Sequence, residues 1–248
     1  YSACLNGSSY CLSGIEALSL IPGTAGATPI QNVGAYGQQI SDVLASIEAF
    51  DIEANNFTVI NAADCAFGYR TSIFKTTARG RYIITAITLH LRHTTPEPPF
   101  YEALARYFEQ NNITTYNPAI VRDAVIAIRS SKLPDPKQVA NNGSFFANPV
   151  VDAVKANDLK DEYGEVPMWP AGEGFKIPAA WLLEQSGFKD YHDTATGMAT
   201  WKNQPLVLVN EHAQSTKDLL DFKQQIVSTV EQKFGITLLQ EPELLPTA

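Results

Sequence analysis

The sequence predicts an α+β protein, and three observations lead to that fold class. Apolar residues make up 45% and charged residues 18% of the 248 residues, which is a globular composition. Segments typical of strands and of helices follow one another in a mixed order, without the regular strand–helix alternation of a parallel sheet. No internal repeat and no low-complexity segment interrupts them.

The first third of the chain begins with a long irregular segment and continues with strands. Five of the fifteen glycines lie within residues 14–37, together with Pro22 and Pro29, so this segment is expected to be a loop with special backbone angles. The run at residues 81–89 is rich in β-branched side chains and predicts the clearest strand. Strands are expected at residues 43–50, 57–60 and 81–89.

Helical patterns dominate the rest of the chain. Pro118 after Asn117 suits the first turn of a helix, and Gly235 is the kind of residue that ends one. The helices are expected at residues 101–110, 117–131, 151–162, 178–186 and 216–234. Further strands are expected at residues 144–146, 206–209 and 238–243.

A proline-containing segment, Lys132–Lys137, predicts a domain boundary. We expect residues 1–128 to form one domain and residues 129–237 to form a second. The last strand, within residues 238–248, could return to the first domain and belong to it.

Charge and composition exclude several classes of partner. The net charge of −8 includes no block of Lys or Arg, so no nucleic-acid partner is expected. No apolar run approaches the roughly 20 residues that span a bilayer, so no membrane partner is expected. The cysteines Cys4, Cys11 and Cys65 lack CxxC spacing and are interpreted as reduced thiols of a cytoplasmic protein. The four histidines show no ligand spacing, so no metal site is expected.

Four polar groups could carry chemistry, and each also has an ordinary structural explanation. The Gly/Pro-rich segment 21–37 could approach a ligand or serve only as a connector. Arg70, among aromatic residues, could bind a carboxylate or phosphate or form a structural ion pair. Ser144 could enter a cleft or be a turn serine, and no Gly-x-Ser-x-Gly surrounds it. Glu243 could be functional or simply solvated.

Taken in order, these groups resemble one family. The segment GIEALSLIPGTAGATPIQNVGAYGQQI at 14–40 is similar to the flavin-binding signature of UDP-N-acetylenolpyruvoylglucosamine reductases, the MurB family of bacterial peptidoglycan synthesis. The other matching blocks follow in the family's order: FGYRTSIFK at 67–75, SKLPDPK at 131–137, NGSFFANPVV at 142–151, AAWLLEQSGFK at 179–189, LVLVN at 206–210 and EPEL at 241–244.

The resemblance implies a fold, a reaction and a catalytic trio. The fold would be the C-terminal part of an FAD-binding α+β domain plus a small α+β substrate-binding domain. The reaction would reduce UDP-N-acetylglucosamine enolpyruvate to UDP-N-acetylmuramate, with FAD as cofactor and NADPH as cosubstrate. Arg70 matches the arginine that binds the substrate carboxylate, Ser144 matches the proton donor to carbon, and Glu243 matches the glutamate beside the carboxylate.

The resemblance also implies binding residues and an oligomeric state. Tyr36, Tyr101, Lys132 and Asn148 match residues that contact the substrate. The flavin would follow a set of loop residues: Ile21, Pro22, Gly23, Ala27, Thr28, Ile30 and Gly34. A monomer is the default expectation.

One departure from the family affects the expected activity. The family has an N-terminal region whose glycine-rich turn holds the FAD pyrophosphate, and nothing in residues 1–13 resembles it. The chain is therefore expected to be a fragment that binds FAD weakly or not at all. Two alternatives stay open: a UDP-sugar binding module without redox activity, and another flavin oxidoreductase whose similarity is confined to the flavin loop.

Overall fold

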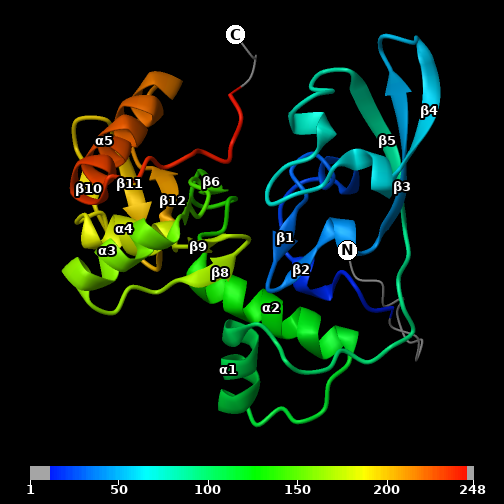
Figure 1. Ribbon diagram of the computed structural model, residues 1–248, viewed down its shortest axis with the longest axis horizontal. Helices are drawn as coiled ribbons and strands as arrows, with labels where there is room; N and C mark the ends of the chain where they lie inside the picture. The colour runs from blue at the N-terminus through cyan, green and yellow to red at the C-terminus, as the bar shows by residue number, and fades with distance from the viewer. Residues whose placement is uncertain (1–11, 245–248) are drawn as a thin grey trace. The chain divides into compact units, whose positions relative to one another are not determined.

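The protein is described by a computed structural model, which covers residues 12–244 (Figure 1). The chain forms two compact units, Tyr1–Arg129 and Ser130–Ala248. Each unit combines helices with antiparallel strands, so the predicted α+β class is confirmed.

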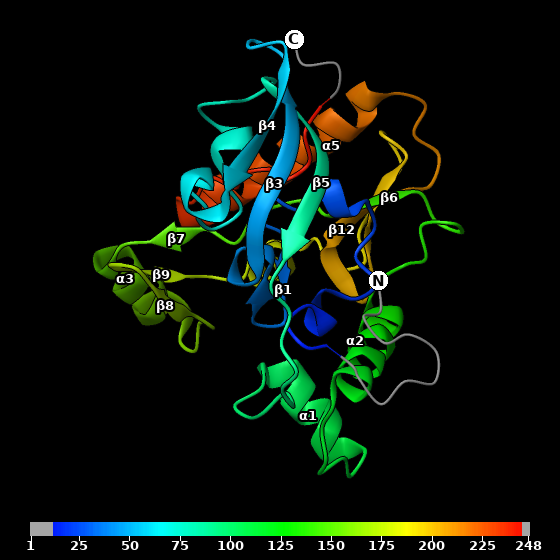
Figure 2. The same cartoon turned by 90° about the vertical axis from the view of Figure 1, so that its right-hand side faces the viewer.

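The first unit is built on a three-stranded antiparallel sheet (Figure 2). Its strands are β3 (Leu44–Asp51), β4 (Asn56–Asn61) and β5 (Tyr82–Leu89), in the order β4-β3-β5. Ile47 and Ala49 of the central strand are fully buried and pack with Phe74. The sheet also exposes apolar side chains at Phe57 and Ile83. All three strands match the predicted ones to within a few residues.

A helical pair completes the first unit. Helices α1 (Glu102–Gln110) and α2 (Pro118–Lys132) bury Leu104 and Phe108 against Val121 and Val125. The Asn117 carboxamide oxygen accepts a hydrogen bond from the backbone N–H of Ile120, which caps α2 as the sequence predicts. Shorter elements lie in the loops: η1 (Glu16–Leu18), η2 (Ala25–Ala27), β1 (Gly34–Ala35), β2 (Gln38–Gln39), η3 (Ile40–Asp42), η4 (Ala62–Cys65) and η5 (Ile73–Lys75).

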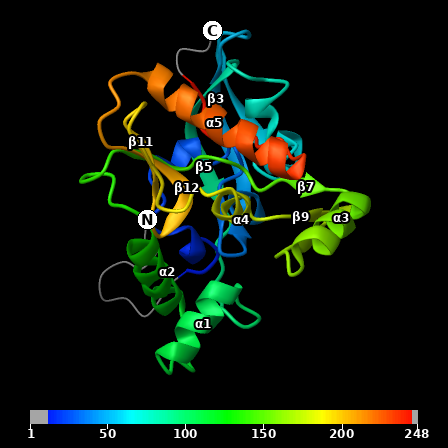
Figure 3. The ribbon, with the colours of Figure 1, turned by 90° about the vertical axis from the view of Figure 1, so that its left-hand side faces the viewer.

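The second unit contains a four-stranded antiparallel sheet and two helices that pack on it (Figure 3). Strand β12 is apolar at every position from Leu206 to Val209 because both of its faces are buried, one against Phe222 and the other against Leu133 and Val139. The elements are β6 (Asn141–Ser144), β10 (His192–Asp193), β11 (Met198–Trp201), β12 (Gln204–Asn210), α4 (Ala179–Gln185) and α5 (Thr216–Phe234).

A second, smaller sheet lies beside helix α3 (Ala153–Tyr163). It consists of β7 (Val150–Val151), β8 (Trp169–Ala171) and β9 (Gly174–Lys176), in the order β7-β9-β8. Helix α5 begins with a capping box between Ser215 and Asp218 and ends at Gly235, whose φ is 61°. The predicted bounds of α5 are confirmed.

Two predicted strands are corrected by the structure. The strand expected at 144–146 lies instead at Asn141–Ser144 (β6), and Phe146 forms only an isolated bridge with Gln240. The strand expected at 238–243 is reduced to a single bridge between Phe146 and Gln240. Gln240 donates to the carbonyl of Pro242 at 2.8 Å, and this turn stops the pairing. Cys4, Cys11 and residues 245–248 of the predicted terminal segment fall outside the described residues.

Two features of the described residues bear on membrane and metal binding. No helix in the described part of the chain is both long and apolar enough to cross a membrane. Within residues 12–244, no three His, Cys, Asp or Glu side chains gather in a way that could hold a metal ion.

Candidate functional site

The glycine-rich loop of the first unit is held in shape by its own backbone. Two backbone hydrogen bonds close successive tight turns. The N–H of Thr28 donates to the carbonyl of Ala25 at 3.1 Å, and the N–H of Val33 donates to the carbonyl of Thr28 at 3.0 Å. The Thr28 hydroxyl adds a bond to the Ala25 carbonyl at 2.7 Å. Gly23 has φ 119°, a backbone conformation that favours glycine. Open space lies where a β-carbon would stand.

Arg70 lies in a two-residue turn of the first unit. Gly68 and Thr71 exchange backbone hydrogen bonds of 3.1 and 3.4 Å, which close the turn around Tyr69 and Arg70. Arg70 has φ 55°, a left-handed conformation that costs a non-glycine residue about 1 kcal/mol or more. Its guanidinium lies 5.5 Å from the centre of the Tyr69 ring, within the range of a cation–π interaction.

Buried polar side chains tie this turn to the glycine-rich loop. The Asn32 carboxamide donates to the Gly68 carbonyl at 3.1 Å, although 36 residues separate them. The Ser72 hydroxyl donates to the Ile30 carbonyl at 2.6 Å. Asn32 is 2% and Ser72 1% exposed, so these bonds form away from water, where losing a partner is costly.

The tie brings Arg70 directly over Gly34. A β-carbon added at Gly34 would stand 3.3 Å from Nη1 of Arg70 and 3.1 Å from the Gln38 carbonyl oxygen. The absence of a side chain at position 34 therefore makes room for the guanidinium. The structure places Gly34 and Arg70, both predicted site residues, in one location.

Tyr36 occupies a tight turn next to this location. Strands β1 and β2 pair Ala35 with Gln38, and Tyr36 and Gly37 form the connection with φ of 49° and 85°. Two positive φ values are typical of a type I′ hairpin turn, in which tyrosine is uncommon. From this turn the Tyr36 ring packs against the helical pair. It contacts the Tyr101 ring edge-to-face, with 5.8 Å between the ring centres and 87° between the ring planes.

Tyr101 stands at the start of α1 and is 52% exposed. Its backbone carbonyl accepts the N–H groups of Leu104 and Ala105, at 2.8 and 3.0 Å, so the first helical turn fixes its backbone. The segment before it packs through Phe100, whose ring lies 5.0 Å from that of Phe108 and 4.7 Å from that of Tyr116.

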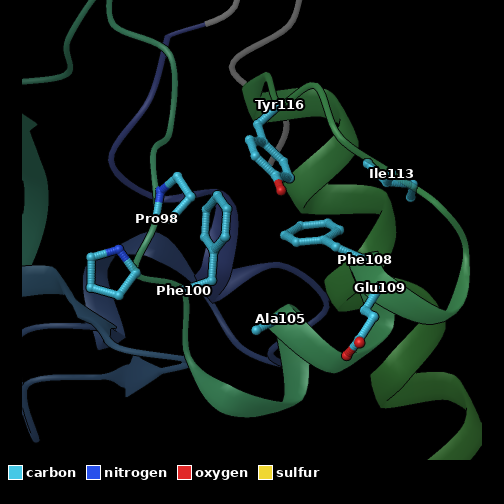
Figure 4. A pocket seen from close by; sticks show the side chains of 8 residues that line it. Pro98, Phe100, Ala105, Phe108, Glu109, Ile113 and Tyr116 are labelled. Atoms are coloured by element: carbon cyan, nitrogen blue, oxygen red, sulfur yellow. The ribbon is translucent and has the colours of Figure 1, made fainter.

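A small cavity lies behind this aromatic cluster (Figure 4). Its volume is about 320 Å³, and Glu109 supplies the single acidic side chain of its lining. The lining residues are Pro98, Pro99, Phe100, Ala105, Phe108, Glu109, Ile113 and Tyr116. None of them was predicted as a site residue. They pack around the segment that precedes Tyr101.

Arg129, near the end of α2, was missed by the sequence interpretation. Its Nε atom is buried without a hydrogen-bond partner. Burial lowers the pKa of Arg129 and raises the pKa of Tyr36, while the charge of Arg129 acts against the change at Tyr36. The only sequence signal was an arginine four residues after Val125 on the apolar stripe of the helix.

Ser144 is the last residue of β6 in the second unit and is exposed. Gly143 before it has φ 70°, and Asn141 accepts the Gly143 N–H at 3.0 Å, which shapes the turn. Phe145 after it is buried, and its N–H bonds to the Leu206 carbonyl at 2.8 Å. The serine is therefore anchored on both sides while its own side chain stays exposed.

The block with Glu243 runs beside the block with Ser144. The N–H of Ala147 bonds to the Leu239 carbonyl at 2.9 Å, and the N–H of Glu241 bonds to the Phe145 carbonyl at 2.9 Å. Glu243 follows two residues later and is exposed. The second unit thus brings together two predicted catalytic blocks that are about a hundred residues apart in sequence.

Asn148 and Lys132 have different local roles. The Asn148 side-chain oxygen accepts the N–H of Ala179 at 2.9 Å and so caps the start of α4. This bond leaves the Nδ2 donors of the carboxamide as the part that a ligand could meet. Lys132 is the last residue of α2 and is exposed.

Comparisons with known proteins agree on one family. A family model described as the C-terminal domain of UDP-N-acetylenolpyruvoylglucosamine reductase matches residues 135–245, which lie within the second unit. A UDP-N-acetylenolpyruvoylglucosamine reductase of Neisseria gonorrhoeae is 42% identical over 239 residues, covering 96% of this chain and 68% of the relative. The reductase of Amoebophilus asiaticus is 42% identical over 240 residues, covering 95% and 70%.

A solved structure supports the fold. The crystal structure of the reductase from Thermus caldophilus superposes with a TM-score of 0.60 at 21% identity, covering 95% of this chain and 65% of that one. The chain spans about two thirds of the length of these relatives. Similarity runs along nearly the whole chain, which argues against the interpretation that confines it to the flavin loop.

Proposed function

Because this chain belongs to the UDP-N-acetylenolpyruvoylglucosamine reductase family, we propose that it carries the substrate-binding and proton-handling residues of that reaction. The enolpyruvyl ether of UDP-N-acetylglucosamine enolpyruvate would be reduced to the lactyl ether of UDP-N-acetylmuramate, a step of peptidoglycan synthesis in the cytoplasm. One alkene carbon gains a hydride and the other a proton, and NADPH becomes NADP⁺. The supporting observation is the tie between the glycine-rich loop and the Arg70 turn.

The residues of the first unit fit the cofactor. The loop keeps its shape through its own hydrogen bonds, and open space lies where a β-carbon would stand at Gly23. The chemistry that bound FAD supplies is hydride transfer between NADPH and the alkene. The residues proposed to hold it are Ile21, Pro22, Gly23, Ala27, Thr28, Ile30 and Gly34.

Arg70 is proposed to bind the substrate carboxylate. Hydride addition to the alkene builds enolate-like charge on that carboxylate, and a donor already in place there is worth about 3–4 kcal/mol in oxyanion-type sites. A guanidinium is permanently charged and matches both carboxylate oxygens. The turn around Arg70 holds it at the cost of a left-handed backbone, and strain of this kind is found at functional sites.

Ser144 and Glu243 are proposed to handle the proton. The exposed Ser144 hydroxyl would give its proton to the alkene carbon that does not receive hydride, a step of the kind worth about 10²–10⁴-fold in rate. Glu243 can donate a hydrogen bond to the substrate only when it is itself protonated.

The proposed roles of each unit follow from its own residues. The first unit carries the flavin loop, Tyr36 and Tyr101, and in the second unit Asn148 is proposed to contact the nucleotide diphosphate. Lys132 at the end of α2 would give a second contact to the diphosphate, since an ammonium group binds phosphate as a point charge.

The first experiment is the visible absorbance spectrum of the purified chain with and without added FAD. A flavin band that co-elutes with the chain at about one per chain supports the cofactor site. Turnover is then followed with NADPH and the UDP-enolpyruvyl sugar. Ser144→Ala should abolish product formation while leaving substrate binding intact, and Ser228→Ala, an exposed serine on α5, is the matched control.

Two outcomes would contradict the proposal. Tight binding of the UDP-sugar without any flavin binding, even after the N-terminal segment of a relative is added, would favour a binding module without redox activity. Full turnover in Ser144→Ala would remove the serine from its proposed role.

A further inference from the structure

Gln240 has a side chain whose presence stability alone does not explain. Its Nε2 donates to the Pro242 carbonyl at 2.8 Å, but its Oε1 is buried without a hydrogen-bond partner. A buried acceptor without a partner costs free energy, and an apolar side chain of similar shape would avoid that cost. The amide donor of Gln240 is therefore the part that needs an explanation.

The bond to Pro242 restrains the peptide unit that leads into Glu243. A peptide bond is planar, so the carbonyl oxygen of Pro242 lies in one plane with the nitrogen and the Cα of Glu243. The ring of Pro242 restricts its φ to about −65°, and the hydrogen bond from Gln240 restricts its ψ. The Cα of Glu243 is thus held at a defined place relative to Gln240.

The backbone of Gln240 is paired with the segment that follows Ser144. Gln240 forms an antiparallel bridge with Phe146, which is buried and lies two residues after Ser144. The N–H of Glu241 bonds to a carbonyl of the same segment at 2.9 Å. Backbone pairing therefore connects Gln240 to Ser144, and a side-chain hydrogen bond connects Gln240 to Glu243.

We propose that Gln240 is a positioning residue: its side-chain amide holds the Pro242–Glu243 peptide unit, and so fixes where the side chain of Glu243 begins relative to Ser144. This inference rests on the proposed function, because it assumes that Glu243 acts on the substrate. Gln240 itself needs no contact with the substrate, since its effect passes through the backbone of Glu243.

The first test measures the backbone of Glu243 and needs no ligand. Gln240→Met keeps the length of the side chain and removes the donor and the acceptor. The NMR order parameter of the Glu243 backbone N–H should fall from about 0.85, the value of a rigid backbone, to below about 0.6. The melting temperature should stay the same or rise, because Oε1 has no partner to lose and Pro242 is partly exposed, so water can bond its carbonyl.

Gln214→Met is the matched control for this measurement. Nε2 of Gln214 also donates to a carbonyl two residues away, that of His212, at 2.7 Å. Its loss should leave the order parameter of Glu243 unchanged. A Glu243 backbone that is already flexible in the wild type, or that stays rigid in Gln240→Met, would overturn the proposal.

A second test follows the reaction with NADPH and the UDP-enolpyruvyl sugar. Gln240→Met should lower kcat by up to about a hundredfold and leave KM unchanged, as expected for a reacting group that is displaced by about 1 Å. In a Glu243→Ala background the same substitution should change kcat little further. Equal losses in both backgrounds would show that Gln240 acts without Glu243 and would overturn the proposal. If the wild-type chain shows no turnover, the proposed function fails for this chain, and the order parameter still decides whether Gln240 positions Glu243.

Discussion

Gly34 lies beneath the guanidinium of Arg70, so close that a β-carbon at position 34 would stand 3.3 Å from Nη1. The two residues belong to separate loops, which the buried side chains of Asn32 and Ser72 fasten together. The position of the Arg70 guanidinium is thus set by the space at Gly34, which has no side chain, and by two buried hydrogen bonds. The proposed carboxylate contact depends on that arrangement.

Gly34→Ala should displace Arg70 and weaken binding of a carboxylate. We expect the affinity for UDP-N-acetylmuramate, whose lactyl group carries the carboxylate, to fall about tenfold or more, because hydrogen bonds to charged groups are worth about 1.5–3 kcal/mol. UDP-N-acetylglucosamine lacks that carboxylate and is the control ligand, measured in the same calorimeter. Equal losses for both ligands would show that the substitution disturbs the loop in general.

Asn32→Ala should destabilise the first unit. Asn32 donates to Gln39 and Gly68 and accepts from the N–H of Ser41, each at 3.1 Å, and burial prevents water from replacing them. We expect a loss of about 2–3 kcal/mol in the free energy of unfolding, measured with urea. Asn55→Ala is the control because Asn55 has a similar φ of 51° and an exposed side chain. Equal losses in both variants would attribute the effect to the backbone.

The ion pair of Asp51 and Arg81 should make stability depend on pH in the acid range. Arg81 donates to both carboxylate oxygens of Asp51, with Nη2 at 2.6 Å, and these bonds lower the pKa of Asp51 although burial opposes the change. The stabilisation is present above the unfolded-state pKa of about 3.9 and is lost as the pH falls through the lower folded-state value.

The corresponding measurement is thermal unfolding of Asp51→Asn at pH 7 and at pH 3. The melting temperature of the variant should be lower than that of the wild type at pH 7, and the difference should shrink at pH 3. Glu53→Gln is the control, since Glu53 is exposed and lies 3.3 Å from Arg81. A difference that is the same at both pH values would exclude the carboxylate as its source.

Cys65 should be unreactive in the folded chain. Its side chain is fully buried, and burial together with the charge of Asp64 raises the pKa of the thiol to about 11. Because the thiolate is the reacting form, iodoacetamide at pH 8 should leave Cys65 unmodified in the native chain and label it in urea. Mass spectrometry of the peptide that contains Cys65 is the measurement, and fast labelling without urea would contradict the assigned burial.

The local sequence predicted the main helices and strands well because their signals are local. Asn117 with Pro118 marks the start of α2, Gly235 ends α5, and the β-branched run of β5 suits a pleated sheet. The strands β8 to β11 were missed because they are only two to four residues long, so pairing rather than composition defines them. The strand expected at 238–243 failed for the same reason: its partner, Phe146, supports one bridge only.

Because motifs are read along the chain, the sequence alone identifies the candidate site residues and their order. Arg70, Ser144 and Glu243 could be named in that way, and so could the glycine-rich loop. The folded structure sets which groups meet: Asn32 with Gly68, Ser72 with Ile30, and Gly34 with Arg70. These contacts join residues 36 to 42 positions apart, so no local sequence pattern predicts them.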